Sequence, residues 1–298
     1  MSDRVCAAVV TFNRKQLLKG TLEALGKQTR PLDAIVVVNN ASTDGTEQLL
    51  ATEFSDLNQI HLPENAGGSA GFHTGLKWGH ENGFDWIWVM DDDVEPYPGT
   101  LERMLQYKPL SGFIHVRRED QKGPFPWEGI WDITALQKFS YPTDVSFNNG
   151  KEWTAVNYAN FEGALIHRSV IDKIGLPDVR FFLAGDDSIY GYLASFHTNV
   201  IYINHIGIRR MLPFDAAIDA NKLYFTFRNK HLLYGYMSAA NVPLSRITFW
   251  FQIFVKLGWL FRHTPEIRTR RHVLRIYQGL RDGVKGKFGR PEWLRKMR

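Results

Sequence analysis

The chain has 298 residues, of which 44% are hydrophobic and 22% are charged, with 25 glycines and 13 prolines. These values exclude a disordered or fibrous protein and suit one large α/β domain or two smaller ones. The single cysteine, Cys6, cannot form an internal disulfide. This favours a reducing, cytoplasmic setting and excludes a zinc site built from cysteines. The N-terminus has no pattern typical of a signal peptide.

The net charge of +5 is unevenly distributed along the chain. Residues 242–298 contain 14 lysines and arginines against three acidic residues, a formal charge of +11, so residues 1–241 carry −6. A basic block of this kind indicates an anionic partner, either nucleic acid or a phospholipid surface. Its most apolar stretch, Ile247 to Phe261, has 15 residues. Because a membrane-spanning helix needs about 20, we expect an in-plane or buried helix instead.

The first hundred residues alternate short β-rich runs with segments of helical spacing. The predicted strands are Val5 to Val10, Ala34 to Val38, a short run ending at Pro63, and Trp86 to Met90. The predicted helices are residues 14–27, 44–54 and 69–82. This alternation predicts an α/β fold with a doubly wound, mostly parallel sheet that binds ligands at the carboxyl ends of its strands.

Beyond Leu101 the pattern is looser, and residues 111–160 indicate only weak hairpins. The next predicted elements are a strand and short helix over residues 161–174, a helix from Asp186 to Phe196, and a strand from Val200 to Asn204 that ends at His205. From Ala216 onward the chain is expected to be mainly helical.

Three adjacent aspartates, Asp91, Asp92 and Asp93, directly follow the predicted strand Trp86 to Met90. Neighbouring carboxylates repel one another, and a hard cation relieves that repulsion. Alternate residues of an extended segment face the same side, so we expect Asp91 and Asp93 to chelate one Mg²⁺ or Mn²⁺ while Asp92 points elsewhere. The alternative is a solvated acidic turn.

A second acidic pair, Asp186 and Asp187, stands at the start of a predicted helix. It is either a helix cap or the separate carboxylate that a metal-dependent reaction needs as a general base. His205 follows a predicted strand, as the three aspartates do, where an imidazole can complete the coordination of a metal. The alternative for His205 is an ordinary hydrogen-bonded histidine.

Two loops have the composition of a nucleotide site. The glycine-rich run from Asn65 to Gly71 enters a predicted helix and can bring backbone N–H groups close to a diphosphate. The polar run from Asn39 to Gly45 lies after the second strand, where a nucleobase sits in open α/β sheets. A tight turn and a plain loop are the respective alternatives.

Taken together, these motifs resemble the GT-A fold of family-2 inverting glycosyltransferases over roughly residues 4–230. The resemblance rests on Thr11 to Arg14, Asn40 to Thr46, Asn65 with Gly67 and Gly68, and the three aspartates. The glycine-rich run, the aspartate motif and the segment Tyr224 to Asn229 resemble the bacterial galactofuranosyl- and rhamnosyltransferase branch.

The resemblance implies a role for each matched residue. Asp91, Asp93 and His205 would bind Mn²⁺ or Mg²⁺, Asp187 would be the base, and Asp186 would orient the acceptor. The residues implied for nucleotide binding are Thr11, Phe12, Arg14, Asn40, Asn65, Gly67, Gly68 and Asp92. Asn40 departs from the Asp often found there, and Ile189 and Leu193 replace a Glu and an Arg of the branch, which concerns acceptor specificity.

Aromatic residues mark two further regions. The candidates for stacking on sugar faces are Trp127, Trp131, Trp153 and Tyr158, with core or loop packing as the alternative. In residues 242–298, phenylalanines and tryptophans mixed with arginines indicate helices lying at a membrane interface. Packing of this aromatic face on the catalytic domain, or on a second subunit of a homo-oligomer, is the alternative.

The sequence therefore predicts a catalytic domain over residues 1–230 and a basic helical region over 231–298, at the cytoplasmic face of a membrane. The favoured function is a metal-dependent inverting transfer of galactofuranose from UDP-galactofuranose to a lipid-linked or polysaccharide acceptor of a cell-surface glycan such as O-antigen, capsule or cell wall. The alternatives are transfer of rhamnose from dTDP-rhamnose and a non-catalytic glycan-binding module. Nucleic acid is not expected as a partner, because residues 1–241 are acidic.

Overall fold

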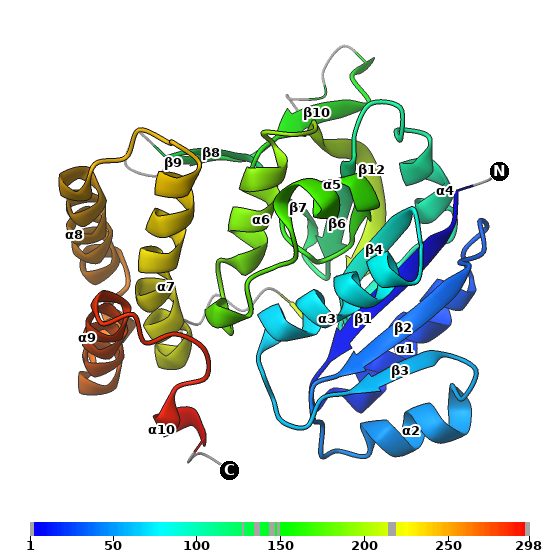
Figure 1. The fold of residues 1–298 in the computed structure, drawn as a ribbon, viewed down its shortest axis with the longest axis horizontal. Coiled ribbons are helices and arrows are strands. Elements are labelled where there is room, and N and C mark those ends of the chain that lie inside the picture. The colour runs from blue at the N-terminus through cyan, green and yellow to red at the C-terminus, as the bar shows by residue number, and fades with distance from the viewer. Residues whose placement is uncertain are drawn as a thin grey trace.

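The computed structural model describes residues 3–126, 128–133, 138–142, 147, 150–213 and 219–295. Within these residues a ten-stranded mixed sheet forms the centre of the molecule, and helices flank both of its faces (Figure 1). The order of the main strands is β3-β2-β1-β4-β11-β6-β12-β10. Strand β5 pairs with β12, and β7 pairs with β6.

The strands of the sheet fall into two directions. Strands β1, β2, β3 and β4 pair in parallel, as do β6 and β12, whereas β11 runs antiparallel between β4 and β6. Their bounds are β1 Val5–Thr11, β2 Ala34–Asn39, β3 Asn58–His61, β4 Trp86–Asp91, β5 Val94–Pro96, β6 Phe113–Asp120, β7 Gly123–Phe125, β10 Trp153–Val156, β11 Ala164–His167 and β12 Val200–Arg210. A separate hairpin pairs β8 (Ile130–Asp132) with β9 (Lys138–Ser140).

Helices cover the sheet on both faces because its strands alternate buried side chains between two cores. Val5, Ala7 and Val9 of β1 face one core, and Cys6 and Ala8 face the other. The first core is closed by α1 (Lys15–Gly26), α2 (Thr46–Glu53) and α4 (Thr100–Leu105). The second is closed by α3 (Gly68–Glu81), α5 (Arg168–Ile174) and α6 (Asp186–Ala194). The doubly wound α/β prediction is confirmed.

A third core lies beside the sheet, on the outer side of α6 (Figure 1). It is built by α7 (Ala220–Ala239), α8 (Arg246–His263) and α9 (Arg270–Val284). The 3₁₀ turns Val179–Phe181 and Pro265–Arg268 and the short α10 (Glu292–Arg295) complete the described elements. The boundary expected after residue 230 falls inside α7.

Two predicted segments differ from the structure. Residues 113–120 form β6, a strand in the middle of the sheet, although the sequence indicated only weak hairpins there. Strand β12 does not end at His205: it continues to Arg210, with register shifts near Ile206 against β6. Pairing of its second half with β5 extends it, so that prediction of the strand end was wrong.

Candidate active site

The carboxyl ends of β1, β2 and β4 lie at one edge of the sheet, because these strands are parallel. A cavity of about 440 Å³ opens at this edge. Its charged lining residues are Arg14, Asp91, Asp93, Glu162, Asp186, Asp187, Arg210 and Lys222. Both predicted aspartate clusters therefore reach one cavity, although 93 positions separate Asp93 from Asp186 in the numbering.

Asp92 braces the loop after β1. Its carboxylate accepts hydrogen bonds from the Thr11 hydroxyl (2.7 Å) and the Phe12 N–H (3.3 Å). Arg14 bridges the two neighbouring aspartates, with its Nη1 3.2 Å from Asp92 and 3.1 Å from Asp93. Asp92 is 3% exposed and does not line the cavity, so it holds the loop after β1 in place from behind the cavity wall. Phe12, in contrast, is 41% exposed, and it is not among the residues that line the cavity.

Asp91 and Asp93 face the cavity together with Glu162, which the sequence analysis did not single out. Enclosure by the protein raises the pKa of Asp91 well above its usual range, and the charges of Asp93 and Glu162 raise it further. Burial also raises the pKa of Glu162. Three carboxyl groups thus share this wall with the guanidinium groups of Arg14 and Arg210, and a bound cation would favour their ionised forms.

The glycine-rich loop is held by the side chains of two asparagines. Asn40 donates to the Gly67 carbonyl (3.0 Å) and accepts from the Ala66 N–H (2.9 Å), and Asn65 accepts from the Gly67 N–H (2.9 Å). Gly67 has φ 88°, and a Cβ there would lie 2.1 Å from the Phe182 carbonyl oxygen. Only glycine fits this position, and Gly68 then lines the cavity.

Asp186 and Asp187 begin α6 after Gly185, whose φ is 95°. Asp186 is 7% exposed, and burial together with the charge of Asp187 raises the pKa of its carboxyl to about 7. Asp187 is more open to the cavity and accepts hydrogen bonds from the Ser188 N–H (2.6 Å) and hydroxyl (3.0 Å). Burial raises the pKa of Asp187 as well, whereas Lys222 opposes this rise. A carboxylate with a raised pKa is suited to take a proton near neutral pH.

The cavity offers hard oxygen donors for a divalent metal. In the described part of the chain, no three histidine, cysteine or acidic side chains are gathered closely enough to form a complete site. Asp91 and Asp93 share one wall, and Glu162 Oε1 nearby is buried without a hydrogen-bond partner. Carboxylate oxygens are the ligands that Mg²⁺ and Mn²⁺ prefer, so this donor set fits such an ion once a ligand supplies further oxygens.

His205 is not among the cavity-lining residues. It lies half-buried within β12, where burial and the nearby charge of Arg103 lower the pKa of its imidazole. Five residues later, at the end of the strand, Arg210 reaches the cavity instead, 3.8 Å from Asp93 and 3.6 Å from Glu162. The structure therefore brings an arginine, and not the expected histidine, to the aspartates.

One of the described aromatic candidates lines the cavity, and the others do not. Tyr158 lines the cavity, and burial followed by the charge of Asp187 raises the pKa of its hydroxyl. Trp131 is 3% exposed and packs edge-on against Tyr158 and Tyr192 in the third core. Trp153 lies on β10, at the edge of the sheet, and does not line the cavity. Trp127 lies outside the described residues.

A buried polar network stands behind the cavity. Arg118 and Glu128 are both 0% exposed and pair at 2.6 Å. Arg118 also donates to Asn160 (3.0 Å) and lies 3.5 Å from Glu162, and His115 Nδ1 is 3.3 Å from Glu128. The network thereby anchors the cavity-facing Glu162 to β6. Sequence patterns missed it because its residues come from separate segments with no motif.

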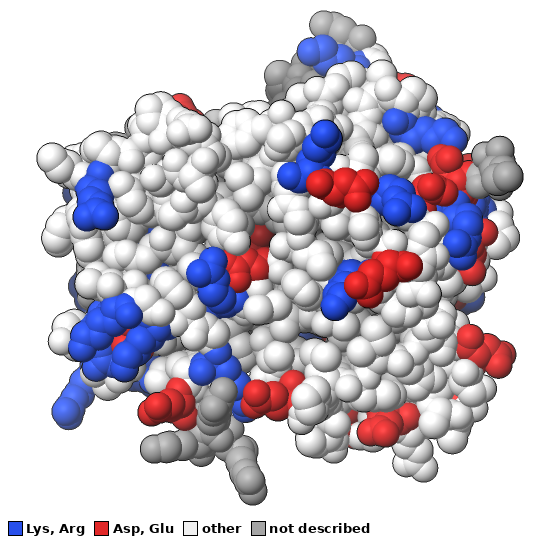
Figure 2. All heavy atoms as spheres, viewed as in Figure 1, with Lys and Arg blue, Asp and Glu red and all other residues white. Residues whose placement is uncertain are grey.

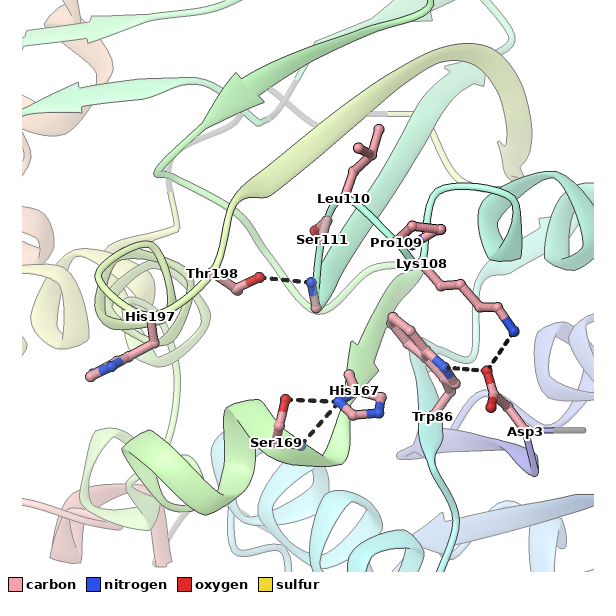
Figure 3. A pocket seen from close by; sticks show the side chains of 11 residues that line it. Asp3, Trp86, Lys108, Pro109, Leu110, Ser111, His167, Ser169, His197 and Thr198 are labelled. Atoms are coloured by element: carbon pink, nitrogen blue, oxygen red, sulfur yellow. Dashed lines mark hydrogen bonds and ion pairs between the residues drawn. The ribbon is translucent and has the colours of Figure 1, made fainter. Parts of the chain in front are cut away.

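A second cavity, of about 360 Å³, lies at the opposite edge of the sheet (Figure 3). Most of its polar side chains bond to one another or to nearby backbone: Asp3 accepts from Trp86 (3.3 Å) and Lys108 (3.0 Å), and Thr198 accepts from the Gly112 N–H (2.7 Å). Since these groups are already paired and lie away from the acidic clusters, we place the chemistry in the first cavity.

The third core leaves an apolar face of α8 exposed. Phe249, Ile253 and Leu260 of α8 are buried against the neighbouring helices. The exposed apolar residues of α8 are Ile247, Trp250, Phe251, Phe254, Val255 and Trp259. Basic side chains gather over α9 beside it (Figure 2). No helix in the described residues combines the length and apolarity needed to cross a bilayer.

Comparison with known proteins identifies the family. The model of glycosyl transferase family 2 matches residues 6–175, more than half of the chain. Galactofuranosyltransferase GlfT1 of Mycobacterium tuberculosis is 25% identical over 332 aligned positions, covering 98% of this chain and 99% of the relative. GlfT1 of Mycolicibacterium smegmatis is 26% identical over 238, covering 75% and 71%.

Solved structures share the fold at low sequence identity. TarS of S. aureus superposes with a TM-score of 0.60 at 15% identity over 99% of this chain, which spans half the length of that structure. TarS 1–349 in complex with UDP-GlcNAc gives a TM-score of 0.60 at 14% identity, covering 99% of this chain and 83% of that one. GalNAc-T7 with UDP, GalNAc and Mn²⁺ gives 0.58 at 11%, covering 88% and 58%. The chain therefore belongs to glycosyl transferase family 2 and is a glycosyltransferase of the GT-A fold.

Proposed function

We propose that the chain is an inverting galactofuranosyltransferase that uses UDP-galactofuranose as donor and a lipid-linked or polysaccharide glycan as acceptor. The observation that carries the proposal is the meeting of two acidic clusters, Asp91 with Asp93 and Asp186 with Asp187, in one cavity at the carboxyl edge of the sheet. The near full-length similarity to GlfT1 supports galactofuranose as the sugar. The complexes of TarS with UDP and UDP-GlcNAc support a UDP-linked donor.

In the proposed reaction, the acceptor hydroxyl lies between Asp187 and the anomeric carbon of the donor. Asp187 takes the hydroxyl proton as the oxygen attacks that carbon from the face opposite the diphosphate. The new C–O bond forms as the bond from carbon to phosphate oxygen breaks, and UDP leaves with the electron pair. One displacement inverts the configuration, and no covalent enzyme intermediate is needed.

The proposed function gives the residues at the donor side of the cavity separate roles. Thr11, Phe12, Arg14 and Asn40 would border the nucleoside, and Gly67 and Gly68 would let the backbone approach the diphosphate. Asp91 and Asp93 would hold Mn²⁺ or Mg²⁺. When bound, such a cation stabilises the negative charge that develops on the leaving diphosphate. Arg14 and Arg210 already place positive charge on the same wall and would add to this stabilisation.

Thermal stabilisation by nucleotide sugars tests the donor. We expect UDP and UDP-galactofuranose to raise the melting temperature more with Mn²⁺ or Mg²⁺ than without, because a ligand that binds only the folded state stabilises it by mass action. At 100 times Kd the gain is about 2.7 kcal/mol. The matched control is dTDP-rhamnose: a response to it alone would move the assignment to rhamnosyl transfer. No response to any nucleotide sugar would contradict the donor assignment.

We further propose that the exposed face of α8 lies on an anionic membrane surface and brings the cavity to a lipid-linked acceptor. The face combines Phe254 (67% exposed) and Trp259 (58% exposed) with the arginines of α8 and α9. Aromatic side chains at the acyl boundary and cations on lipid phosphates are typical of interfacial helices.

Vesicle sedimentation tests this surface. We expect the full chain to bind phosphatidylglycerol vesicles and to bind phosphatidylcholine vesicles far more weakly. Phe254→Ser combined with Trp259→Ser should weaken binding about 100-fold or more, since each buried aromatic contributes about 1.5–3 kcal/mol. Leu110→Ser is the control, because Leu110 is 45% exposed but lies at the second cavity. Equal sedimentation of the double variant and the wild type would contradict the proposal.

A further inference from the structure

The segment that leads into the aspartate pair has an unusual backbone. Phe182 (φ 63°), Ala184 (φ 68°) and Gly185 (φ 95°) all adopt left-handed conformations directly before Asp186. Two of these residues carry a Cβ and disfavour this region. Because such a backbone persists only where its surroundings impose it, the position of Asp186 and Asp187 depends on what holds residues 181–185.

Asn229 of α7 holds this segment through its side-chain amide. Its Nδ2 donates to the carbonyls of Phe181 (3.0 Å), Leu183 (2.8 Å) and Ala184 (2.8 Å). An amide has two N–H groups, so three acceptors share them. Asn229 is 1% exposed, and three carbonyl groups of one short loop point toward its Nδ2 atom.

Arg228, the residue before Asn229, holds the same segment. We call these two side chains, Arg228 and Asn229, the clamp. Arg228 donates from Nε to Asn229 Oδ1 (2.8 Å), which orients the amide with its NH₂ group toward the loop. Its Nη2 donates to the carbonyls of Arg180 (3.2 Å) and Phe181 (2.6 Å), and its Nη1 donates to the Gly289 carbonyl. The Gly289 N–H in turn donates to the Arg180 carbonyl (2.8 Å).

The environment of Arg228 differs from that of an ordinary buried ion pair. Among the described residues no carboxylate lies within ion-pair distance of it. Its guanidinium, 0% exposed, lies instead over the rings of Phe225 (4.9 Å) and Tyr224 (5.5 Å). Burial lowers the pKa of Arg228, and the charge of Asp282, which accepts a hydrogen bond from Tyr224, offsets only part of this effect. Burying the cation is therefore costly to stability, and its benefit is to be sought in the loop whose carbonyls it binds.

We propose that Arg228 and Asn229 are positioning residues that hold the strained loop 181–185 and thereby aim Asp186 and Asp187 into the cavity. This rests on the proposed function, in which Asp187 is the base. Neither residue is among those that line the cavity, so both act through the backbone that starts α6. On its other side, the same loop packs against Gly67 through the Phe182 carbonyl. The loop therefore lies between α7 and the glycine-rich loop and contacts both.

The test compares Asn229→Ala and Arg228→Lys with Leu232→Ala, a truncation in the same helix whose side chain is buried in the third core. For the first two variants we expect kcat to fall about 10- to 100-fold, since small misplacement of a catalytic group costs this much. The KM for UDP-galactofuranose should change less than about twofold, and the acidic limb of the pH–rate profile should shift. Leu232→Ala should lower the melting temperature without either effect.

Hydrogen–deuterium exchange supplies a readout that needs no activity. Peptides covering residues 179–188 should exchange faster in Asn229→Ala and Arg228→Lys than in the wild type, whereas peptides of β1 and β4 should not change. Unchanged exchange there, or a fall in activity matched by Leu232→Ala at equal loss of stability, would overturn the clamp. If the wild type transfers no sugar from any donor, the proposed function fails, and the exchange data alone still decide whether the clamp exists.

Discussion

Asp187→Asn is expected to lower the turnover of sugar transfer by about 10²- to 10⁴-fold and to leave donor binding within about twofold of the wild type. The amide keeps the size of the side chain and its hydrogen bond from the Ser188 N–H, but it cannot accept the proton of the acceptor hydroxyl. In the proposed function, UDP binding depends instead on Arg14, Asp91 and Asp93, which line the same cavity. The measurement pairs steady-state kinetics with UDP-dependent melting.

Asp93→Asn is the matched comparison for this result. It should weaken metal-dependent UDP binding as well as turnover, because Asp93 lies on the donor wall beside Arg14. Near-normal turnover of Asp187→Asn would show that another group takes the proton. Equal losses of UDP binding in the two variants would show that the two clusters do not have separate roles.

The melting temperature of Asp187→Asn at two pH values shows whether a loss of turnover is caused by a loss of folding. Burial raises the pKa of Asp187 in the folded protein, so the folded state holds its proton at a pH where the unfolded chain has lost it. Below about pH 4 this carboxyl is protonated in both states and does not lower the free energy of unfolding. As the pH rises above the pKa of the unfolded chain, the free energy of unfolding falls. We expect Asp187→Asn to melt at or above the wild-type temperature at pH 8, and near it at pH 4.

Arg118→Met is expected to destabilise the fold by about 3–5 kcal/mol, the usual cost of leaving one member of a buried ion pair without its partner. Arg118 and Glu128 are fully buried, and Asn160 and His115 bond to the same two residues. Removing the guanidinium leaves the Glu128 carboxylate without its charge partner in the interior. Urea denaturation followed by circular dichroism measures the change.

Arg117→Met, at the next position of β6, is the control. Arg117 is partly exposed and donates to Asn204 at 2.9 Å, so its loss should cost less than about 1 kcal/mol. The double variant Arg118→Met with Glu128→Leu should recover part of the loss, because it removes the unpaired charge. A loss below about 1 kcal/mol for Arg118→Met alone would contradict the role of this network as an anchor.

The first part of the fold could be predicted from sequence because local patterns decide it. Apolar runs such as Ala34–Asn39 form buried parallel strands, and the loops after them carry the polar residues of the site. The sequence did not predict β6, because His115, Arg117 and Arg118 interrupt its apolar pattern. Two of these polar residues, His115 and Arg118, are buried beside Glu128, which pairs with both from another segment of the chain, and no local rule anticipates that.

In the candidate site, too, local patterns predicted some residues, and long-range pairing determined the others. Both acidic clusters were predicted from their positions after a strand and before a helix, and both line the cavity. Glu162 was missed because it stands alone in the sequence, and the antiparallel β11 brings it to the edge. His205 was expected at a strand end, but pairing with β5 extends β12 to Arg210. Long-range pairing, which the sequence does not display, decides such positions.

The contact between Gly67 and Phe182 bears on the order in which the substrates bind. In the proposed function, the glycine-rich loop contacts the donor, and the loop before Asp186 lies on the side of the acceptor. A Cβ at residue 67 would meet the Phe182 carbonyl oxygen at 2.1 Å, and the Ser69 N–H donates to the same oxygen at 3.4 Å, so the two loops are in direct contact. We therefore expect a diphosphate bound at the first loop to restrict the second loop as well. We infer a sequential kinetic scheme in which the nucleotide sugar enters before the acceptor and UDP departs last.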